Sequence, residues 1–370
     1  MLIVCSKSNL LNGLQIVSKA VPNKTTMDIM ECILLDASFD QITLTASDTQ
    51  LGMKTTIDGE IVKRGIVAID AKIFVDMVRK LPDSDVTIET EEGTYKTTVT
   101  CGKAKFNIMG KSPDTFTPIP DVEGEVSIEI SNFALKEVIR QTVFSIADND
   151  NNKLMTGELF DIKDNQMRFI SLDGHRVSIR RIELNGNYAP VKLIVPGKTL
   201  NELSKILSGE ADSIVTIIYT DRHILFEFDK TIVVSRLIEG EYFMIDQMLS
   251  GDYETKVKIN KREFLSCLDR ATLLVKEGDK KPVIISMTDN NMELRIKSVL
   301  GSMNEDIEIE KNGKDLQIGF NPKFLIDALR VIDDEDVELY MVNSKAPCFI
   351  KNVEESYIYL VLPVNFMTVD

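Results

Sequence analysis

Aromatic residues are scarce in this sequence of 370 residues, and its 43 basic residues are outnumbered by 58 acidic ones. It contains no tryptophan and only 6% aromatic residues, so we do not expect an array of aromatic side chains on which nucleic-acid bases stack. Its net charge is −15, which taken alone argues against the basic domain of a sequence-specific DNA-binding protein. Such a charge is compatible with a protein whose outer surface repels nucleic acid.

Long apolar runs and paired cysteines are also missing. No apolar run approaches the ~18 residues that a membrane-spanning helix needs. Residues 1–7 are too short and wrongly ordered for a secretory signal. The five cysteines are scattered, odd in number, and form no C-x-x-C pair. We therefore expect buried thiols in a reduced, cytoplasmic protein.

One segment of the sequence occurs in three versions at a fixed spacing. Residues 166–176, Gln-Met-Arg-Phe-Ile-Ser-Leu-Asp-Gly-His-Arg, alternate and then turn, a pattern typical of a half-buried strand. Similar segments, 42–48 and 292–298, lie 125 residues before and after it. Asp48 and Asp173 correspond, and Ser298 takes the third place. The chain, 44% hydrophobic and 27% charged as in ordinary globular proteins, is therefore predicted to contain three copies of one unit.

Each copy is predicted to contain two helices followed by alternating, strand-like stretches. The six helical patterns have apolar residues every three to four positions, and the first helix of each copy begins at a good N-cap residue, Ser6, Ser131 or Asn260. The predicted helices cover residues 6–20, 70–81, 131–143, 196–207, 260–275 and 321–332. Helices on one face of mainly antiparallel sheets make an α+β architecture.

Two segments rich in proline, glycine and acidic residues separate the copies. They cover residues 116–124 and 249–255 and are interpreted as linkers. The predicted units are 1–120, 126–249 and 256–370.

All six predicted helices carry a net positive charge of +1 or +2, although the whole chain has a net charge of −15. If the helices share one face of the protein, that face is a basic lining on an acidic body. The alternative is that Lys and Arg simply favour helices. Because the sign is the same in six of six helices, we favour a shared basic face.

Several motif-like segments do not complete a motif. Gly197-Lys198-Thr199 resembles the end of a phosphate-binding loop, but the first glycine of that loop falls on Lys192. Residues 148–152 resemble the start of a calcium loop, but the required glycine falls on Lys153 and the closing glutamate on Leu159. Residues 333–336 are acidic and are interpreted as a solvated loop. We predict neither a metal nor a cofactor.

Catalysis and partner binding leave alternatives open at this point. His175 and His223 are the only histidines, and neither lies in a nucleophile motif, although the members of a catalytic triad need not be neighbours in sequence. Asp173-Gly174 is interpreted as a hairpin turn. The apolar residues that follow the last predicted strand, Pro363, Val364 and Phe366, either pack locally or line a groove for a partner.

Over its whole length the sequence resembles the bacterial DNA sliding clamps, the beta subunits of DNA polymerase III. The resemblance rests on the threefold repeat and on the order and spacing of five short motifs. These are Thr156-Gly157, Asp173-Gly-His-Arg176, Arg236-Leu-Ile-Glu-Gly240, Gly319-Phe-Asn-Pro322 and Tyr359-Leu-Val-Leu-Pro-Val364. It implies a non-catalytic, head-to-tail homodimer that forms a ring of six domains. The ring would encircle duplex DNA without sequence preference, with twelve helices lining its hole.

The resemblance also implies site residues. The DNA-contacting positions would be Lys24, Lys72, Asn149, Lys198 and Lys323. A groove between the second and third units would bind Gln-Leu-x-Leu-Phe-like peptides of replicative and translesion polymerases, the clamp loader and repair proteins. Its residues would be Met155, Leu172, Gly174, His175, Arg176, Val177, Phe243, Gln247, Met248, Val361, Leu362, Pro363 and Val364. The dimer interface would use Lys103, Lys105, Phe106, Leu273, Leu274, Glu305 and Asp306.

This sequence departs from the family pattern at several points. Phe243 replaces a common proline, Gln247 replaces a basic residue, and residues 367–370 extend the usual end of the chain. These changes could alter the peptide preference of the groove, and the acidic loop 148–152 could weaken DNA contact. Two other hypotheses are a repeat scaffold that binds peptides without encircling DNA, and a hydrolase centred on His175.

Overall fold

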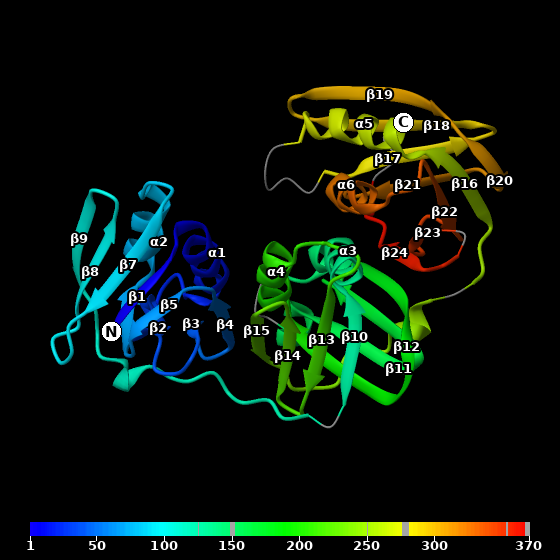
Figure 1. Cartoon of the computed structure of the whole chain (residues 1–370). Helices are drawn as coiled ribbons and strands as arrows, with labels where there is room; N and C mark the ends of the chain where they lie inside the picture. Colours follow the sequence, from blue (N-terminus) through cyan, green and yellow to red (C-terminus); the bar gives the residue numbers. More distant parts are fainter. Residues whose placement is uncertain (125, 149–151, 250, 276–280, 353, 367–370) are drawn as a thin grey trace. The chain divides into compact units, whose positions relative to one another are not determined.

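The computed structural model describes residues 1–124, 126–148, 152–249, 251–275, 281–352 and 354–366. Contacts divide the chain into two compact units (Figure 1). The first consists of Met1–Lys136 and Lys198–Leu237, and the second consists of Glu137–Gly197 and Ile238–Asp370. None of the helices formed by the described residues is both long enough and apolar enough to cross a bilayer.

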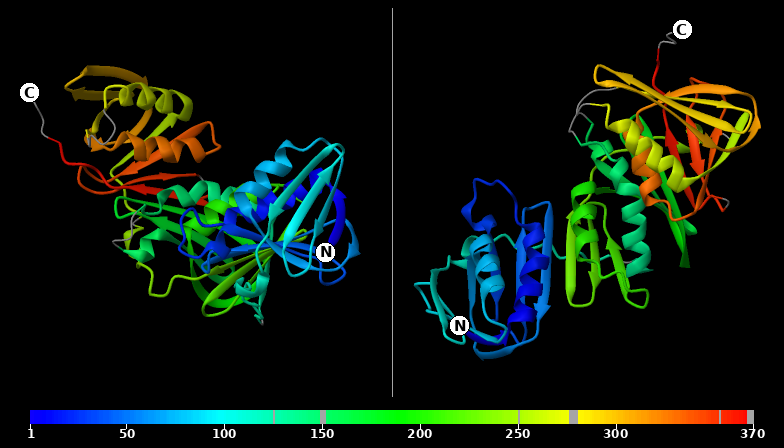
Figure 2. Two further views of the ribbon diagram at one scale, coloured as in Figure 1. Left: turned by 90° about the vertical axis from the view of Figure 1, so that its left-hand side faces the viewer. Right: turned by 90° about the horizontal axis from the view of Figure 1, so that it is seen from above.

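The six predicted helices are confirmed. They are α1 (Lys7–Val17), α2 (Ala71–Lys80), α3 (Asn132–Thr142), α4 (Gly197–Ile206), α5 (Lys261–Thr272) and α6 (Pro322–Val331). α1 is shorter than predicted because residues 18–20 form a 3₁₀ turn, and α5 ends three residues early at Thr272. α1 and α2 lie side by side within the first unit, as do α5 and α6 within the second (Figure 2).

The predicted N-caps are present at the first helix of each repeat. The side chain of Ser6 accepts a hydrogen bond from the Asn9 amide at 3.2 Å, and that of Ser131 accepts one from the Ala134 amide at 3.1 Å. Asn260 accepts from two amides at the start of α5. Each cap pairs amide groups that the first turn of a helix leaves unbonded.

The strands form four sheets that are antiparallel throughout the described residues. The strands are β1 (Leu2–Ser6), β2 (Cys32–Asp36), β3 (Ile42–Ser47), β4 (Leu51–Ile57), β5 (Glu60–Lys63), β6 (Ile66–Asp70), β7 (Asp85–Thr90), β8 (Lys96–Cys101), β9 (Ala104–Met109), β10 (Ser127–Ser131), β11 (Gly157–Leu172), β12 (Arg176–Pro196), β13 (Ile214–Tyr219), β14 (His223–Phe228), β15 (Thr231–Arg236), β16 (Thr255–Asn260), β17 (Val283–Thr288), β18 (Asn291–Ser298), β19 (Gly301–Glu308), β20 (Glu310–Gly313), β21 (Leu316–Phe320), β22 (Asp336–Met341), β23 (Cys348–Lys351) and β24 (Tyr357–Val361). The strand orders are β5-β1-β7-β8-β9, β10-β13-β14-β15-β4-β3-β2-β6, β11-β12-β24-β23-β22-β16-β20 and β19-β18-β17-β21.

The turn that marks the sequence repeat has the same construction in the first two copies. Asp48 Oδ1 accepts the amides of Gln50 and Leu51, and Asp173 Oδ1 accepts those of His175 and Arg176. Gly174 has φ +84°, a left-handed conformation that suits glycine. The interpretation of Asp173-Gly174 as a hairpin turn is therefore confirmed.

Two sheets are continuous across the junctions between repeats. β4, which follows the Asp48 turn, pairs with β15, the last strand of the second repeat. β12, which follows the Asp173 turn, pairs in the same antiparallel manner with β24, the last strand of the third repeat. Among the strands that the structure describes, two in corresponding positions do not take part in such a junction. They are β19, which follows Ser298 in the third repeat, and β9, the last strand of the first repeat. Each lies at the end of its own sheet.

The linker after the first repeat covers an apolar face at the first junction. Residues 116–124 contain no helix or strand, and Ile119 and Val122 pack on a cluster that includes Leu225 and Val234. Ile119 lies so close to Gly52 that a Cβ added there would meet it at 2.7 Å. Glycine at this position is therefore what lets the linker lie directly on the sheet.

β11 folds back on itself near Asp164, whose φ is +55°. Phe160 stacks edge-on against Phe169 at 4.6 Å, and Glu158 accepts a hydrogen bond from Ser171 at 2.7 Å. In an extended strand, residues so far apart in sequence would lie tens of ångströms apart, since each residue advances the chain by about 3.3 Å. The two halves of β11 are therefore neighbours.

Glu158 is a fully buried carboxyl group between these halves. Burial raises its pKa from 4.5 to about 8, although hydrogen bonds from Ser171 and Thr142 oppose the shift. Thr142 Oγ1 lies 2.9 Å from Oε1 and 2.7 Å from the carbonyl oxygen of Val138. A protonated Glu158 can therefore donate to Thr142 while Thr142 donates to Val138. The folded protein holds this proton up to pH ~8, whereas an unfolded chain releases it near the ordinary pKa.

We predict that Glu158→Gln removes a pH-dependent loss of stability. The folded protein binds more protons than the unfolded chain between pH 4.5 and about 8, so stability from this group is present at low pH and lost across that window. The free energy of unfolding of the variant should rise relative to the parent by roughly 1 kcal/mol per pH unit there. Urea unfolding from pH 5 to 8.5 measures it. Glu227→Gln, on an exposed position of β14, is the control, and parallel pH profiles of parent and Glu158→Gln would contradict the prediction.

Candidate functional site

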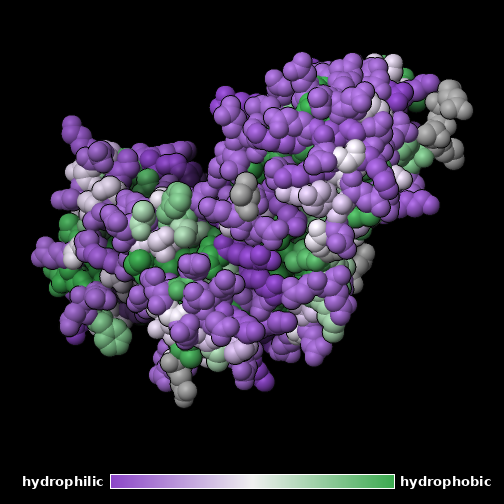
Figure 3. All heavy atoms as spheres, turned by 90° about the vertical axis from the view of Figure 1, so that its right-hand side faces the viewer, coloured by the Kyte–Doolittle hydropathy of each residue, from purple (hydrophilic) through white to green (hydrophobic). Residues whose placement is uncertain are grey.

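An apolar cavity of about 230 Å³ lies in the second unit. Most of the surface seen in Figure 3 is hydrophilic, and apolar side chains reach it in small patches. The cavity is lined by Met155, Leu172, Gly174, His175, Arg176, Val177, Phe243, Met248, Pro347, Leu360 and Leu362. Met248 and Leu362 are 52% and 38% exposed, so the cavity has an apolar rim that solvent reaches.

Three neighbouring strands build the floor of this cavity. Leu172 of β11 is paired with Val177 of β12, and Val177 is paired with Leu360 of β24. The chain leaves β24 along the hairpin turn, because the Leu362 amide donates to the His175 carbonyl oxygen at 2.8 Å. The pairing of β12 with β24 therefore brings Val177 and Leu360, 183 positions apart in the sequence, into one apolar surface.

The segment after Gly240 forms one wall. Tyr242 is held in place because its hydroxyl donates to the carbonyl oxygens of Gly157 at 3.3 Å and Ile170 at 3.2 Å. Phe243 packs edge-on against the Tyr242 ring at 5.6 Å. Ile245 is buried on the sheet and anchors the 3₁₀ turn Ile245–Met248, from which Met248 reaches the cavity.

Arg176 joins the hairpin turn to the third repeat. Its guanidinium is 8% exposed and donates to Asp173 Oδ2 at 2.8 Å, to Asp327 Oδ2 of α6 at 2.7 Å and to the Phe144 carbonyl oxygen at 2.7 Å. It also lies over the Phe324 ring, 4.6 Å from the centroid. Partners on every side satisfy the buried charge, which fixes the turn that carries Gly174 and His175.

The structure brings together nine of the thirteen groove residues implied by the resemblance. Four do not line the cavity: Gln247 bonds to Met244, Val361 is fully buried, and Pro363 and Val364 lie beyond Leu362, with the Val364 amide bonded to Gly319. Pro347 and Leu360 line the cavity and were not on the predicted list. No local signal in the sequence indicated either residue, because Tyr357–Val361 is apolar throughout and Pro347 lies outside any predicted element.

The surroundings of His175 do not form a catalytic triad. Its ring stacks on Phe324 with centroids 6.1 Å apart. In the described part of the chain, no hydrogen bond joins its side chain to a serine or cysteine. Nor do the described residues contain a group of three or more His, Cys, Asp or Glu side chains that could hold a metal ion.

The predicted DNA-contacting lysines are on the surface. Lys24, Lys72, Lys198 and Lys323 are all exposed, and Lys198 forms an ion pair with Asp48. Asn149 lies outside the described residues.

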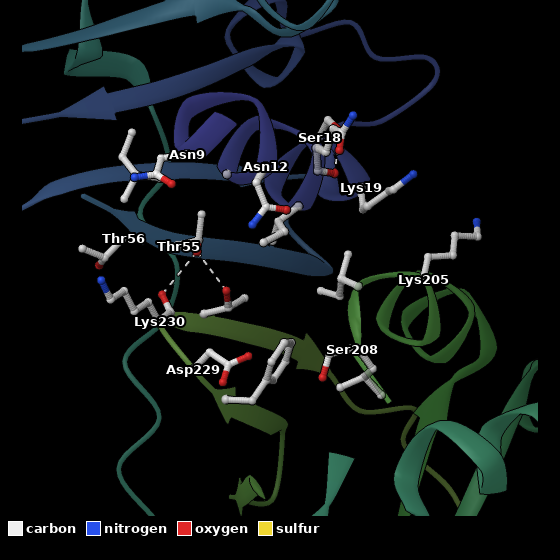
Figure 4. Close-up of a pocket in the computed structure, with 18 of the residues that line it drawn as sticks. Asn9, Asn12, Ser18, Lys19, Thr55, Thr56, Lys205, Ser208, Asp229 and Lys230 are labelled. Atoms are coloured by element: carbon white, nitrogen blue, oxygen red, sulfur yellow. Dashed lines mark hydrogen bonds between the residues drawn. The ribbon is translucent and has the colours of Figure 1, made fainter. Parts of the chain in front are cut away.

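A second, polar cavity of about 860 Å³ lies in the first unit. Figure 4 shows Asn9, Asn12 and Lys19 from the first helical region and Lys205 from α4 around it. Lysines from helical segments of two repeats therefore lie around one hollow.

The predicted interface residues lie on or beside β9 and β19. Lys105 and Phe106 are exposed on β9, and Lys103 is in the turn before it. Leu273, after α5, is 77% exposed, and Leu274 follows it. On β19, Glu305 forms an ion pair with Arg270 of its own chain, and Asp306 accepts a hydrogen bond from Asn291 at 2.7 Å.

Three protein-family models match the chain in succession. They describe the DNA polymerase III beta subunit, with its N-terminal domain at residues 1–120, its central domain at 129–243 and its C-terminal domain at 246–365. The beta sliding clamp of Staphylococcus epidermidis is 32% identical over 366 residues, covering 96% of this chain and 97% of that protein. That of Staphylococcus aureus is 33% identical over 358 residues, covering 94% of each.

Solved structures give the same result. A Eubacterium rectale protein assigned as a DNA polymerase III beta subunit is 67% identical, with a TM-score of 0.96 over 99% of each chain. The sliding clamp of Bacillus subtilis is 30% identical, with a TM-score of 0.95 over 99% of this chain and 100% of that one.

We predict that Arg176→Ala destabilises the second unit by about 3–5 kcal/mol, because Asp173 and Asp327 are left without their buried cation. Thermal and urea unfolding measure the change. Arg295→Ala is a matched control, since its ion pair with Glu293 is half exposed and should contribute at most about 1 kcal/mol. Equal losses for the two variants would show that the Arg176 contacts do not hold this region together.

Proposed function

The chain belongs to the DNA polymerase III beta subunit family, the sliding clamps, and on this basis we propose that two copies close head-to-tail into a ring around duplex DNA. A sliding clamp is a processivity factor and not an enzyme. We assign three clamp units, 1–120, 126–249 and 256–370, to each copy, and place the ring in the cytoplasm. It would tether replicative and translesion polymerases, the clamp loader and repair proteins.

The succession of strand pairings between repeats carries the ring proposal. The strand after the marked turn in one repeat pairs with the last strand of the next repeat, first as β4 with β15 and then as β12 with β24. A third pairing of the same kind would join β19 to β9. A second copy of the chain can supply that partner strand. If β19 of each copy pairs with β9 of the other, the exposed edge strands of both copies are paired.

The charges on these strands support the pairing. If the register of the two observed junctions is carried forward by the repeat spacing, Lys103 comes within one residue of Asp306. Lys105 comes within one residue of Asn304. Opposite charges at facing positions of antiparallel strands are stabilising. Phe106 and Leu273, both exposed in the single chain, would be covered by such a contact.

The basic helices support the DNA part of the proposal. Lysines on helices of an acidic protein would face the phosphates, while the acidic remainder of the surface would not hold DNA. Contacts to phosphates carry no sequence information, so a ring held by topology could move along the duplex. The proposed contacts are Lys72, Lys198 and Lys323 on helices, Lys24 in the segment between Ala20 and Asp28, and Asn149.

The apolar cavity supports peptide binding. Its volume and its methionine and leucine lining suit a leucine or phenylalanine side chain, and methionines adapt to different anchors. We propose that partners insert a Gln-Leu-x-Leu-Phe-like segment there. Phe243 and the Gln247 position would adjust the preference for individual partners.

We predict that reversing charges on either strand weakens the dimer and that mixing the two variants restores it. One variant is Lys103→Glu with Lys105→Glu, and the other is Asn304→Lys with Asp306→Lys. Each places like charges opposite each other and should raise the dimer dissociation constant by about tenfold or more. The mixture pairs opposite charges at both contacts. Sedimentation measures all three samples, and variants that dimerise as well as the parent would refute the β9–β19 pairing.

The same proteins distinguish a ring from an open peptide-binding scaffold. Loaded on nicked circular DNA by a clamp loader, the parent and the mixture should stay bound through gel filtration, and cutting the circle should release them. Either variant alone should be retained poorly. A parent protein that dimerises but is lost equally from circular and cut DNA would favour the scaffold.

For the groove we predict saturable binding of a labelled Gln-Leu-Ser-Leu-Phe peptide, measured by fluorescence anisotropy. Met155→Ala with Met248→Ala should weaken it about tenfold, because truncating apolar anchors in a binding pocket typically costs more than 1 kcal/mol. Removing the residues after Val361 should abolish it. Met27→Ala, at an exposed position of the first unit, is the control and should bind like the parent. Undiminished binding by both groove variants would place the peptide elsewhere.

A further inference from the structure

A charged cavity of about 760 Å³ lies on the same sheet face as the apolar groove. At the groove, Leu172 of β11 is paired with Val177 of β12. Two residues further along each strand, Ile170 is paired with Ile179 on the same face of the sheet. Arg168 and Arg181 form the pair after that and line the charged cavity. Alternate residues of a strand share one face, so the two cavities are about 13 Å apart along β11.

The 3₁₀ turn Ile245–Met248 lies between the two cavities. Its Ile245 belongs to the same buried cluster as Ile170 and Ile179, Met248 lines the apolar groove, and Asp246 lines the charged cavity. Met244, just before this turn, is 71% exposed. A peptide that extends from the groove would therefore reach the charged cavity by passing over this one exposed turn.

Arg168 forms hydrogen bonds with two acidic side chains, those of Asp161 and Asp246. Its Nε donates to Asp161 Oδ2 at 3.1 Å, and its Nη1 donates to Asp246 Oδ1 at 2.6 Å. The hydrogen bond from Arg168 lowers the pKa of Asp246 against a smaller effect of burial, and Lys192 and Arg181 lower it further. These two cations are therefore close to Asp246 without being its hydrogen-bond partners.

The residues that line this cavity carry a net positive charge. Its lining includes four cations, Lys163, Arg168, Arg181 and Lys192, and three acids, Asp161, Asp164 and Asp246. Arg168 pairs with two of the acids. Within the described part of the chain neither Arg181 nor Lys192 forms an ion pair, and Lys192 is exposed while Arg181 is half-buried.

We propose that Arg181 and Lys192 bind acidic residues flanking the apolar anchor of a partner peptide. The inference rests on the proposed peptide groove, which is separated from the charged cavity only by the Ile245–Met248 turn. In a chain of net charge −15, an acidic segment is repelled from most of the surface, so a local cationic cavity both attracts and orients it. The 13 Å separation corresponds to about four extended residues between anchor and acid.

The test compares peptides that differ only in charge. A Gly-Ser-Asp-Asp extension is added to either end of Gln-Leu-Ser-Leu-Phe, with Gly-Ser-Asn-Asn as the neutral match. One acidic peptide should bind the full chain about three- to tenfold tighter than its neutral match at low salt. The gain should disappear near 0.5 M salt, since screening weakens exposed pairs.

Substitutions in the charged cavity then test which residues cause the higher affinity for the acidic peptide. Arg181→Ala and Lys192→Ala should each reduce it while leaving the affinity for the unextended peptide unchanged. Lys297→Ala, an exposed lysine on β18, is matched in net charge and should retain it. Equal affinities of acidic and neutral peptides, or a gain that both variants keep, would overturn the inference while the groove proposal stands. Failure of the unextended peptide to bind would overturn both.

Discussion

The guanidinium of Arg176 is the contact on which the groove region depends. It is enclosed by Asp173, Asp327 and the Phe144 carbonyl group, so one side chain holds the hairpin turn, α6 and the 3₁₀ turn after α3 in a single arrangement. The first repeat uses a weaker form of the same connection, because Asp48 in the corresponding turn pairs with Lys198 of α4. In both cases the turn of one repeat is tied to the second helix of the next.

Strand pairing and ion pairing therefore act together at each junction. The β12–β24 ladder brings Leu360 and Leu362 to the hairpin, Arg176 fixes the turn, and the segment around Tyr242 closes the remaining side. The peptide binding proposed above would depend on this arrangement, because no single repeat contains all the residues that line the cavity. In the proposed ring, β9 and β19 would pair in the same way with a second copy, so the proposed assembly and the proposed binding site would use one kind of strand pairing.

The sequence predicted the parts of this structure that follow local periodicity. Helix positions, the caps at Ser6, Ser131 and Asn260, and the turn at Asp173 all depend on residues close in the chain. All five residues of β24 are buried, so alternation alone could not separate Leu360, which faces the groove, from Val361, which does not. Pro347 and the buried pairing of Glu158 with Thr142 depend on contacts between distant segments, for which no local signal exists.

The linker lying on Gly52 has a consequence for stoichiometry. At the first junction, Ile119 and Val122 already occupy the apolar face, as an internal ligand would, whereas at the second junction the corresponding face keeps an open cavity. An incoming peptide would have to displace the protein's own chain at the first junction, whereas none of the described residues fills the cavity at the second. Each copy would then hold one partner through this kind of groove, and a ring of two copies would hold two partners at once. Any further partner would have to compete for one of these two sites.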